Sequence, residues 1–509
     1  MRNKEKSFDI AEKIGKVIPD PVIIFIGLYI ILMATSLFLG GKSFSVSTFD
    51  GGRKVYEFKY MFTAENIRWI FSNAILNNWL AFGGGILGTI IIVMFGIGVA
   101  EESGLLSILI RKLGSSIHSS LLPYMLVFLG IMSNIASDVG YLVLVPLAGT
   151  LYAGIGKNPL IGMAAAFAGV SAGYSANLIP ANVTDVIIGT NALSFAESQN
   201  IPFVSQTGKP LTPATMNYFF MAASTVLLVI LGGLITTKIT SKKCSRIPVE
   251  NTLDTDSTEI TDKENRALKF ALIGFILSLI IVFLLSYFPL RPYTAENGQT
   301  ITPYIDNVIL LVTLIFFISG AFYGFASGKF KSASDLVGAM SRQIGTMSYV
   351  IVLTFFCYNF LSLFSYTNAD VFITGAGASF LQGMGFSGSP VIMIIATIAV
   401  TSIIDLFVGG MTAKWMLLGP VFIPMLYSVN NAMTPDVVAA AYRVADSCVN
   451  TITPLMTYAG VILMYMRKYK ADFSAGNLIS IMMPYSLIFL VGWTLLLIIF
   501  VQFKIPLGF

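Results

Sequence analysis

Arginine and aspartate stand three residues apart in an apolar stretch of this chain, 441-AYRVADSCVNTITPLMTYAGVIL-463. Asn450 and Thr451 follow Arg443 and Asp446, and Pro454 then removes a helical hydrogen bond. Ionisable groups within a membrane cost several kcal/mol and by default mark an ion pair or a transport pathway. Residues three apart share a helix face, so Arg443 and Asp446 could neutralise part of each other's charge. The alternative is that one of them also faces a substrate or couples to ion binding.

Three other apolar stretches are interrupted by small and oxygen-bearing residues: SNIASDVG within 119–150, GYSANLIPANVTD within 159–190 and DLFVGGMTAKW within 382–428. Irregular backbone at membrane depth is tolerated only inside protein or beside a wet cavity. Carbonyls, hydroxyls, amides and carboxylates are ligands for a dehydrated sodium ion, and broken helices direct positive N-termini toward an anion. We therefore expect two similar cation sites, one formed by Ser133, Asn134, Ser175 and Asn177 and the other by Asp405, Gly409, Asn450 and Thr451.

Other candidate residues have both a structural and a functional reading. Asp185 could cap a helix after the break at Pro180, or it could be a functional carboxylate. Lys414 could extend to the membrane interface beside an anchoring Trp415, or the two could bind an aromatic carboxylate. Pro435 fits the start of a helix, with a direct transport role as the alternative.

The elements that position these residues are membrane-spanning helices. The chain has 509 residues, 55% of them hydrophobic and only 11% charged, with a mean hydropathy of +0.80. Soluble proteins carry about 25% charged residues. The single histidine and the three cysteines, which show no paired spacing, give no sign of a zinc site or a disulfide framework. We also expect no nucleic-acid partner. We expect no cofactor beyond a coupling ion, sodium or a proton.

Apolar stretches and the distribution of Lys and Arg predict the topology. Basic clusters fall on one side if 119–150 and 382–428 enter and leave the membrane from the same side, as re-entrant hairpins. The loop 41–75, with five basic residues, is the main exception because it is then external. The prediction is an all-α polytopic protein with nine crossings, two opposed hairpins, a cytoplasmic N-terminus and an external C-terminus. The expected apolar stretches are 21–40, 79–100, 119–150, 159–190, 215–237, 267–289, 304–327, 345–366, 382–428, 437–465 and 478–504.

The same pattern divides the chain into two halves. Residues 1–237 form the first, with the hairpin 119–150 and the broken helix 159–190. A hydrophilic cytoplasmic linker, 238–266, follows. The second half, 267–509, starts with an extra helix at 267–289 that inverts the next copy, which holds the hairpin 382–428 and the broken helix 437–465. Inverted repeats with broken helices at the midplane are typical of secondary transporters.

Four motifs in order resemble the p-aminobenzoyl-glutamate transporter (AbgT) family: SNIASDVGYLVLVPLAG, AGVSAGYSANL, DLFVGGMTAKWMLLGPVFIPML and AYRVADSCVNTITPLMTY. A more distant resemblance is to sodium/dicarboxylate symporters. The family resemblance implies a homodimer in the bacterial inner membrane, with a scaffold and a mobile transport domain in each protomer. It also implies roles for Asp185, Trp415, Pro435, Arg443 and Asp446.

Two departures from the family pattern bear on ion and substrate. Asp405 stands where the family usually has asparagine, and the added carboxylate could alter ion affinity or make the site proton-sensitive. The sequence after SAN is IPANVTDVI rather than the Leu-Gly-Thr-Ile-Asp-Pro that is common in the family.

These features favour an elevator-type, ion-coupled secondary transporter of a small aromatic or dicarboxylate anion such as p-aminobenzoyl-glutamate. Arg443 and Lys414 would offset the substrate charge. One alternative is a proton-driven exporter of p-aminobenzoate or sulfonamide antimetabolites, and another is a sodium/dicarboxylate symporter. An intramembrane enzyme would need a nucleophile or metal ligands for which no pattern is seen, and two sealed hairpins argue against a passive channel.

Overall fold

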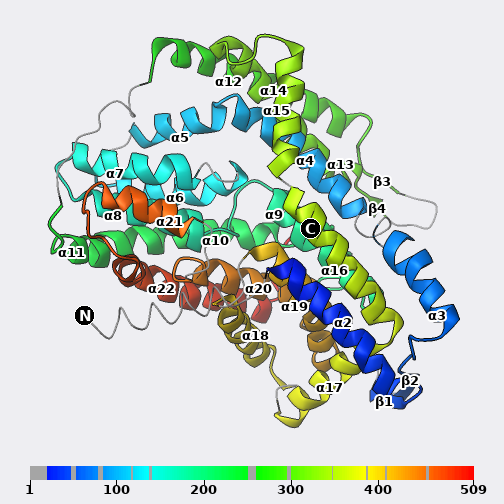
Figure 1. Cartoon of the computed structure of the whole chain (residues 1–509). Helices are drawn as coiled ribbons and strands as arrows, with labels where there is room; N and C mark the ends of the chain where they lie inside the picture. Colours follow the sequence, from blue (N-terminus) through cyan, green and yellow to red (C-terminus); the bar gives the residue numbers. More distant parts are fainter. Residues whose placement is uncertain are drawn as a thin grey trace.

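Helices make up nearly all of the computed structural model, with two short antiparallel strand pairs beside them (Figure 1). The structure describes residues 20–47, 53–77, 79, 84–115, 119–136, 140–249, 260–294, 300–346, 348–385, 388–406, 410–453 and 458–509. Several helices start where the sequence supplies a cap. Asp20 precedes Pro21 and accepts a hydrogen bond from Val22, and Asn158 caps a helix that begins at Pro159.

The first half contains a long run of helices interrupted at two places. Its elements are α2 (Pro21–Leu39), β1 (Ser43–Ser47), β2 (Arg53–Glu57), α3 (Ala64–Trp69), η1 (Ile70–Asn77), α4 (Gly84–Glu102), α5 (Leu105–Ser115), α6 (Leu122–Ser133), η3 (Asn134–Ala136), η4 (Gly140–Leu144), α7 (Val145–Gly154), α8 (Pro159–Phe167), η5 (Ala168–Ala172), α9 (Val183–Ser198), η6 (Pro213–Thr215), α10 (Tyr218–Ile235), η7 (Thr236–Thr240) and α11 (Ser241–Cys244). The η elements are short 3₁₀ or π turns.

The second part of the chain, from residue 262 on, also contains long helices and two interrupted stretches. Its elements are α12 (Asp262–Tyr287), β3 (Tyr293–Thr294), β4 (Thr300–Ile301), α13 (Pro303–Asp306), α14 (Val308–Ser327), α15 (Ala333–Thr346), α16 (Ser348–Tyr366), α17 (Ala369–Gly383), α18 (Pro390–Asp405), α19 (Met411–Val429), α20 (Pro435–Val449), α21 (Ala459–Arg467) and α22 (Ala475–Gln502).

All four predicted helix interruptions are confirmed. Regular α-helix stops between α6 and α7, between α8 and α9, between α18 and α19 and between α20 and α21. The linker is narrower than expected, because helical structure continues from α10 to Cys244 and α12 begins at Asp262. A capping box between Thr261 and Glu264 explains this earlier start.

Five described helical stretches are long and apolar enough to cross a membrane: Pro21–Leu39, Pro213–Cys244, Asp262–Tyr287, Val308–Ser327 and Ala475–Gln502. On α12 large apolar side chains such as Phe270, Ile280 and Phe283 are exposed, although the helix packs along α14. An exposed apolar face of this length is typical of contact with lipid, so the chain is a multi-pass membrane protein.

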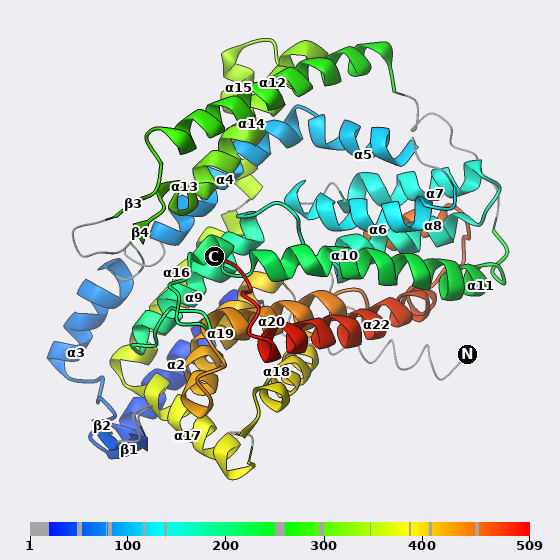
Figure 2. The same cartoon turned by 180° about the vertical axis from the view of Figure 1, so that it is seen from behind.

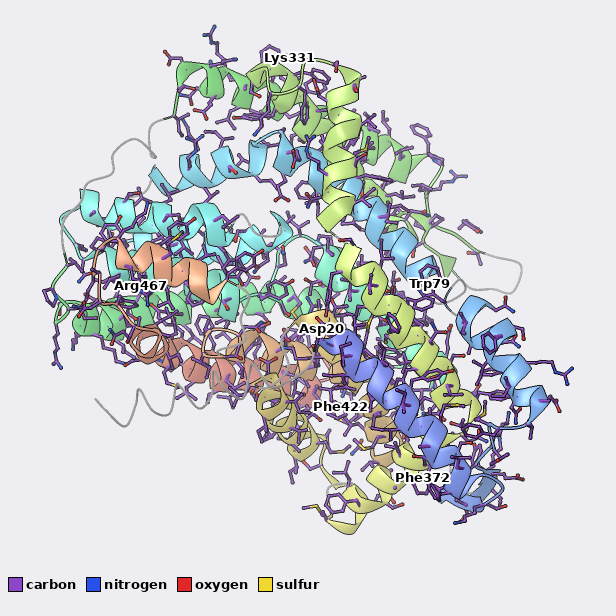
Figure 3. All side chains as sticks on the ribbon, in the orientation of Figure 1. Asp20, Trp79, Lys331, Phe372, Phe422 and Arg467 are labelled. Atoms are coloured by element: carbon purple, nitrogen blue, oxygen red, sulfur yellow. The ribbon has the colours of Figure 1, made fainter. Side chains whose placement is uncertain are left out.

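The helices pack in two groups, which both views separate (Figures 1 and 2). In one group α4 packs against α14 and α15, and α14 packs against α12; α2 packs against α16 alongside. Tyr349 of α16 donates a hydrogen bond of 3.1 Å to Asp20 at the start of α2, where Figure 3 labels this aspartate. The other group contains α6 to α10 and α18 to α22, with α20 against α18, α19 and α22.

Close helix approach holds α6 against the interrupted helix α8–α9. A Cβ built on Gly130 would lie 2.7 Å from the Cα of Gly169, and one on Gly169 would lie 2.3 Å from the carbonyl oxygen of Val127. Small residues allow such backbone contact in membrane proteins. The contact brings the end of α6 to the start of the first broken segment.

Candidate functional site

Every residue of α20 is buried, including its three charged ones, Asp436, Arg443 and Asp446. Pro435 occupies the first turn of this helix, which confirms its expected place as a helix start. A buried charge is retained only with a partner, so the partners of these side chains define the site.

Arg443 reaches from the second half of the chain to the broken segment of the first. Its Nη2 lies 2.6 Å from Oδ1 of Asp185 and donates a second hydrogen bond, of 2.8 Å, to the carbonyl oxygen of Ser175. Ser447, one turn further, accepts a 3.1 Å hydrogen bond from the backbone N–H of Ser175. Two contacts thus fasten α20 to the interruption between α8 and α9.

Asp185 caps a helix, as its structural reading predicts, and it also forms an ion pair. It is the N3 residue of a capping box at the start of α9, in which the backbone N–H of Asp185 donates to Asn182 and the backbone N–H of Asn182 donates to Asp185. Its other carboxylate oxygen takes the Arg443 ion pair. The helix start and the ion pair therefore hold the same carboxylate in one orientation.

Lys414, Asp405 and Asp446 form a second buried charge cluster. The Lys414 ammonium forms an ion pair with Asp405 and lies 2.7 Å from Oδ1 of Asp446, and all three side chains are at most 1% exposed. Tyr442 lies 3.4 Å from the same Asp446 oxygen while donating to the carbonyl of Met411 at 2.6 Å. Two carboxylates and one ammonium give this cluster a formal charge of −1.

These partners correct two expectations. The prediction that Arg443 and Asp446 partly neutralise each other is wrong: each takes its charged partner from another helix. The idea that Lys414 extends to the membrane interface is also wrong, because its side chain is 1% exposed. Helical spacing shows which side chains share a face, but tertiary packing of α19 against α20 chooses the partner.

Trp415 is fully buried, so it is not an interfacial anchor. Its indole Nε1–H donates a 3.1 Å hydrogen bond to the carbonyl of Ile188 in α9. Its ring packs against Tyr442 with centroids 4.8 Å apart and against Phe195 at 6.1 Å. This tryptophan therefore links the charge cluster on α20 to α9.

The four residues expected in the first cation site lie at the ends of α6 and α8–α9. Ser133 donates to the carbonyl of Gly130 at 2.7 Å, and Asn177 accepts from Ile179 at 2.8 Å. Among the described residues, both amide atoms of Asn134 and the hydroxyl of Ser175 are buried without a hydrogen-bond partner. Unpartnered buried polar atoms cost free energy unless an ion or water satisfies them.

Only some of the residues expected in the second cation site lie close together. Asn450 donates to Asp446 at 3.5 Å, so Asp405, Asp446 and Asn450 lie together around Lys414. The Thr451 hydroxyl donates to the nearby carbonyl of Cys448 at 3.4 Å. Gly409 lies outside the described residues.

Several contacts at the site had only a weak signal in the sequence. Ser447 directly follows Asp446 within AYRVADS, but nothing in the spacing indicates its bond to Ser175. Tyr141 in η4 stacks on Tyr458, next to the second broken helix, with centroids 4.5 Å apart. These contacts join the interruptions of the two halves, and only the three-dimensional packing reveals them.

Comparisons with known proteins agree on one family. The model of the AbgT putative transporter family matches residues 6–509. The p-aminobenzoyl-glutamate transport protein of Escherichia coli (strain K12) is 28% identical over 515 residues, which cover 99% of this chain and 96% of that protein.

Two solved structures share the fold. The YdaH transporter of Alcanivorax borkumensis matches with a TM-score of 0.86 and 32% identity, over 96% of this chain and all of that one (100%). MtrF of Neisseria gonorrhoeae, described as illuminating a class of antimetabolite efflux pumps, matches with a TM-score of 0.83 and 31% identity, over 96% of this chain and 97% of that one. The match over the whole chain, the shared fold and the resemblance of the four interrupted motifs lead to one conclusion: this chain belongs to the AbgT putative transporter family.

Proposed function

We propose that this chain is an ion-coupled secondary active transporter of a small aromatic or dicarboxylate anion such as p-aminobenzoyl-glutamate. The observation that carries the proposal is the buried cluster of Lys414, Asp405 and Asp446, held on helices that flank two interruptions. Membership of a transporter family and the name of the E. coli relative support the substrate class.

The coupling ion acts on the excess negative charge of this cluster. Its formal charge of −1 would fall to zero when one sodium ion or one proton binds at the carboxylates. Because the cluster is buried, an uncompensated charge there costs several kcal/mol, and neutralising it favours the movement of the whole cluster across the membrane. Asn450 supplies a further amide beside Asp446 for a bound cation.

The substrate anion interacts with the cations of the site. Arg443 offers a planar fork, and its Nε is buried without a hydrogen-bond partner among the described residues. Once the coupling ion has bound, Lys414 would release one of its two carboxylate partners and pair with the substrate anion instead. Trp415 and Tyr442 provide aromatic surface next to both cations.

A second cation site is proposed at Ser133, Asn134, Ser175 and Asn177. The unpartnered amide of Asn134 and hydroxyl of Ser175 support it, because a sodium ion would satisfy these oxygen atoms. Together the two sites would couple transport to more than one ion.

Alternating access would follow an elevator-type movement. The group that contains α6 to α10 and α18 to α22 carries both charge clusters, and the group of α4, α12, α14 and α15 carries neither. The first group would move against the second as the transport domain. The proposed setting is a homodimer in a bacterial inner membrane, with nine crossings, two re-entrant hairpins, a cytoplasmic N-terminus and an external C-terminus.

Transport into proteoliposomes tests the proposal. Uptake of labelled p-aminobenzoyl-glutamate would be measured with a sodium gradient at equal pH, with a pH gradient without sodium, and with neither. We expect one gradient to drive accumulation above the level reached without a gradient. Equal, non-accumulating flux under all three conditions would mean that the chain is not an ion-coupled transporter of this substrate.

Export is a second candidate because MtrF, which shares the fold, belongs to a class described as antimetabolite efflux pumps. The same vesicles, loaded with p-aminobenzoate or a sulfonamide and given an inward proton gradient, would lose the compound faster than without a gradient. Competition by simple dicarboxylates would favour the sodium/dicarboxylate alternative instead.

A further inference from the structure

Two adjoining cavities lie between the β1–β2 hairpin, α3, the junction of α16 and α17, and the C-terminal ends of α9 and α19. Their volumes are about 250 Å³ and about 320 Å³. They share five lining residues: Ser198, Gln199, Ser365, Asn368 and Asp370. We call the two together the vestibule. Their combined size is in the range of small-molecule sites, about 300–1,000 Å³.

The larger cavity has an aromatic and cationic wall. Trp69 stacks on Tyr366 with centroids 3.5 Å apart and an interplanar angle of 10°. The Lys59 ammonium lies 3.5 Å from the centroid of the same tyrosine ring. The Trp69 ring and the Lys59 ammonium are both too close to the Tyr366 ring to lie on the same face of it. They therefore lie on opposite faces of Tyr366. An aromatic ligand could add to this stack, and a carboxylate could reach Lys59.

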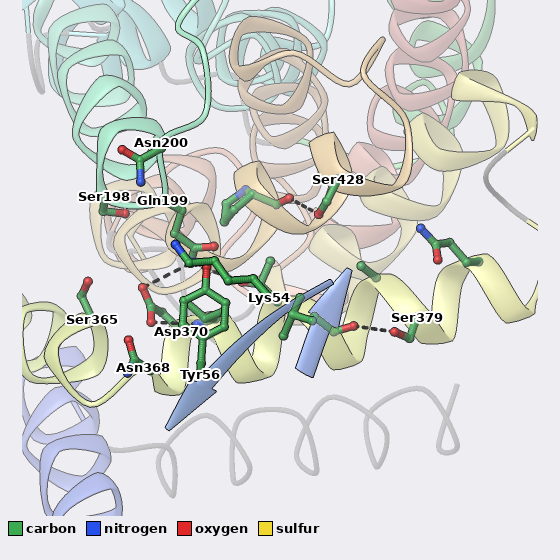
Figure 4. A pocket seen from close by; sticks show the side chains of 17 residues that line it. Lys54, Tyr56, Ser198, Gln199, Asn200, Ser365, Asn368, Asp370, Ser379 and Ser428 are labelled. Atoms are coloured by element: carbon green, nitrogen blue, oxygen red, sulfur yellow. Dashed lines mark hydrogen bonds between the residues drawn. The ribbon is translucent and has the colours of Figure 1, made fainter. Parts of the chain in front are cut away.

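The smaller cavity has a polar wall. Figure 4 shows Lys54 and Tyr56 extending from β2 toward Gln199 and Asp370. Gln199 donates to Asp370 at 3.3 Å and to Thr374 at 3.4 Å. Amide and hydroxyl groups with a lysine above them suit a ligand that carries an amide and a carboxylate.

The floor of the larger cavity leads toward the central charge cluster. Phe195 lines the cavity and packs on Trp415, whose other neighbour, Tyr442, lies beside Asp446. A Cβ on Gly419 would lie 2.6 Å from the Phe195 ring, so this ring fills the space between α9 and α19. Three aromatic rings thus form a chain of contacts from the vestibule to Asp446.

The lysines of the vestibule explain an exception in the charge pattern. The loop 41–75 carries five basic residues on the proposed external side, where the distribution of Lys and Arg disfavours them. Lys54 and Lys59 of this loop line the cavities. Positive charge there would attract an anion from the external solution.

We propose that the vestibule is a recognition site for an aromatic amide with a carboxylate-bearing arm, separate from the buried charge clusters. The ring stacks beside Trp69 in the larger cavity, and the carboxylates meet Lys59 and Lys54. The inference rests on the proposed function for its ligand class. Because the vestibule is lined by α16 and α17 as well as by α9 and α19 of the proposed transport domain, the elevator movement would open or close it.

Binding of p-aminobenzoyl-glutamate to the purified full-length chain tests the site, by calorimetry in lipid nanodiscs. The Lys54→Gln/Lys59→Gln double variant should bind at least about tenfold more weakly, because each substitution removes a charge-assisted contact with a ligand carboxylate. Lys42→Gln removes a basic residue of the same loop that does not line either cavity, and should bind as the wild type does. Equal affinity in the double variant and in Lys42→Gln would overturn the proposal.

Tryptophan fluorescence locates the ligand. Trp69→Phe keeps a ring for stacking and should keep the calorimetric affinity while losing most of the quenching by the ligand. Trp69→Leu removes the ring and should weaken binding. Quenching that persists unchanged in Trp69→Phe would place the ligand away from the vestibule.

The Asp446→Asn background separates this proposal from the proposed function. If Asp446→Asn abolishes transport and still binds the ligand in a Lys54- and Lys59-dependent way, both proposals stand. Lysine-dependent binding by a wild-type chain that transports nothing leaves the vestibule as a binding site and removes the transport function. Transport with a KM that is unaffected in Lys54→Gln/Lys59→Gln removes the vestibule alone.

Discussion

Arg443 and Asp185 belong to different halves of the chain, and their side chains meet with Nη2 and Oδ1 2.6 Å apart. The same guanidinium nitrogen donates to the carbonyl of Ser175, in the interruption that precedes Asp185. One side chain therefore ties a helix of the second half to both sides of a break in the first. A shift of either half relative to the other must strain or release this pair.

Replacing Arg443 by lysine keeps the charge and loses the planar fork. A lysine ammonium cannot contact Asp185 and Ser175 with the same geometry, so we expect initial transport rates to fall at least about tenfold, equivalent to about 1.4 kcal/mol. Rates would be measured in proteoliposomes, beside the melting temperature of the purified protein. Arg342→Lys is the matched control, because Arg342 is 59% exposed and its partner Glu102 is 31% exposed, so this pair lies near the surface. Wild-type affinity and rate in Arg443→Lys would refute bidentate recognition by this arginine.

Asp446→Asn should abolish transport while the protein still inserts in the membrane. The amide carries no charge, so the cluster falls from −1 to zero and loses a carboxylate at which the coupling ion is proposed to bind, while Asp405 still pairs with Lys414. Insertion would be measured by size-exclusion chromatography of the detergent extract, and transport by initial rates. Asp472→Asn, an exposed partner of Lys470, is the control and should transport normally. Unchanged initial rates in Asp446→Asn would count against a coupling role.

Asp405→Asn changes the formal charge of the Lys414 cluster from −1 to zero. With less negative charge to offset, a cation binds more weakly, so the sodium or proton concentration for half-maximal rate should rise by roughly tenfold. The measurement is a titration of initial rate against sodium at fixed pH, repeated against pH without sodium. Titrations identical to those of the wild type would remove Asp405 from ion coupling.

The positions of the helix interruptions could be predicted because their causes are local. Glycine, proline and polar residues replace the apolar pattern at each break, and the helices end there, as at Ser133 and Asp405. The resemblance to the family added Asp185, Trp415 and Arg443 as candidate functional residues. The structure places all three at one buried junction between α9, α19 and α20.

The partners of the charges could not be predicted, because they depend on packing between distant segments. Lys414 is the fourth residue of α19. From the sequence alone, its ammonium could contact water or lipid headgroups as well as Asp446. The sequence does not indicate the vestibule for the same reason. Tyr366 lies about 300 residues after Lys59 and Trp69, and the three meet only because the segment after β2 packs on the end of α16. A local pattern contains no signal of such a contact.

Asp370 should make ligand binding at the vestibule depend on pH. Burial raises the pKa of this carboxyl from 3.8 to about 7, although a backbone hydrogen bond from Val371 opposes the shift. Below pH 7 the group is protonated and neutral, so an anionic ligand meets less repulsion. We expect p-aminobenzoyl-glutamate to bind roughly tenfold more tightly at pH 6 than at pH 8.

The other ionisable side chains that line the vestibule are Lys54, Tyr56, Lys59, Tyr358 and Tyr366. Burial lowers the pKa of Lys59. Asp370→Asn should therefore flatten the dependence between pH 6 and 8, whereas Lys59→Gln should weaken binding and keep the slope. A slope that survives in Asp370→Asn would assign the titration to another group.

The same raised pKa predicts how stability changes with pH. The folded chain keeps the Asp370 proton up to about pH 7, whereas the unfolded chain releases it near 3.8. The stabilisation is present in full below pH 3.8 and is lost as pH rises through about 7, so the contribution of this group to the free energy of unfolding falls across that window. The melting temperature of Asp370→Asn relative to wild type should accordingly rise between pH 5 and pH 8, because asparagine carries no charge to bury. A difference that stays constant over this range would show that Asp370 is ionised throughout.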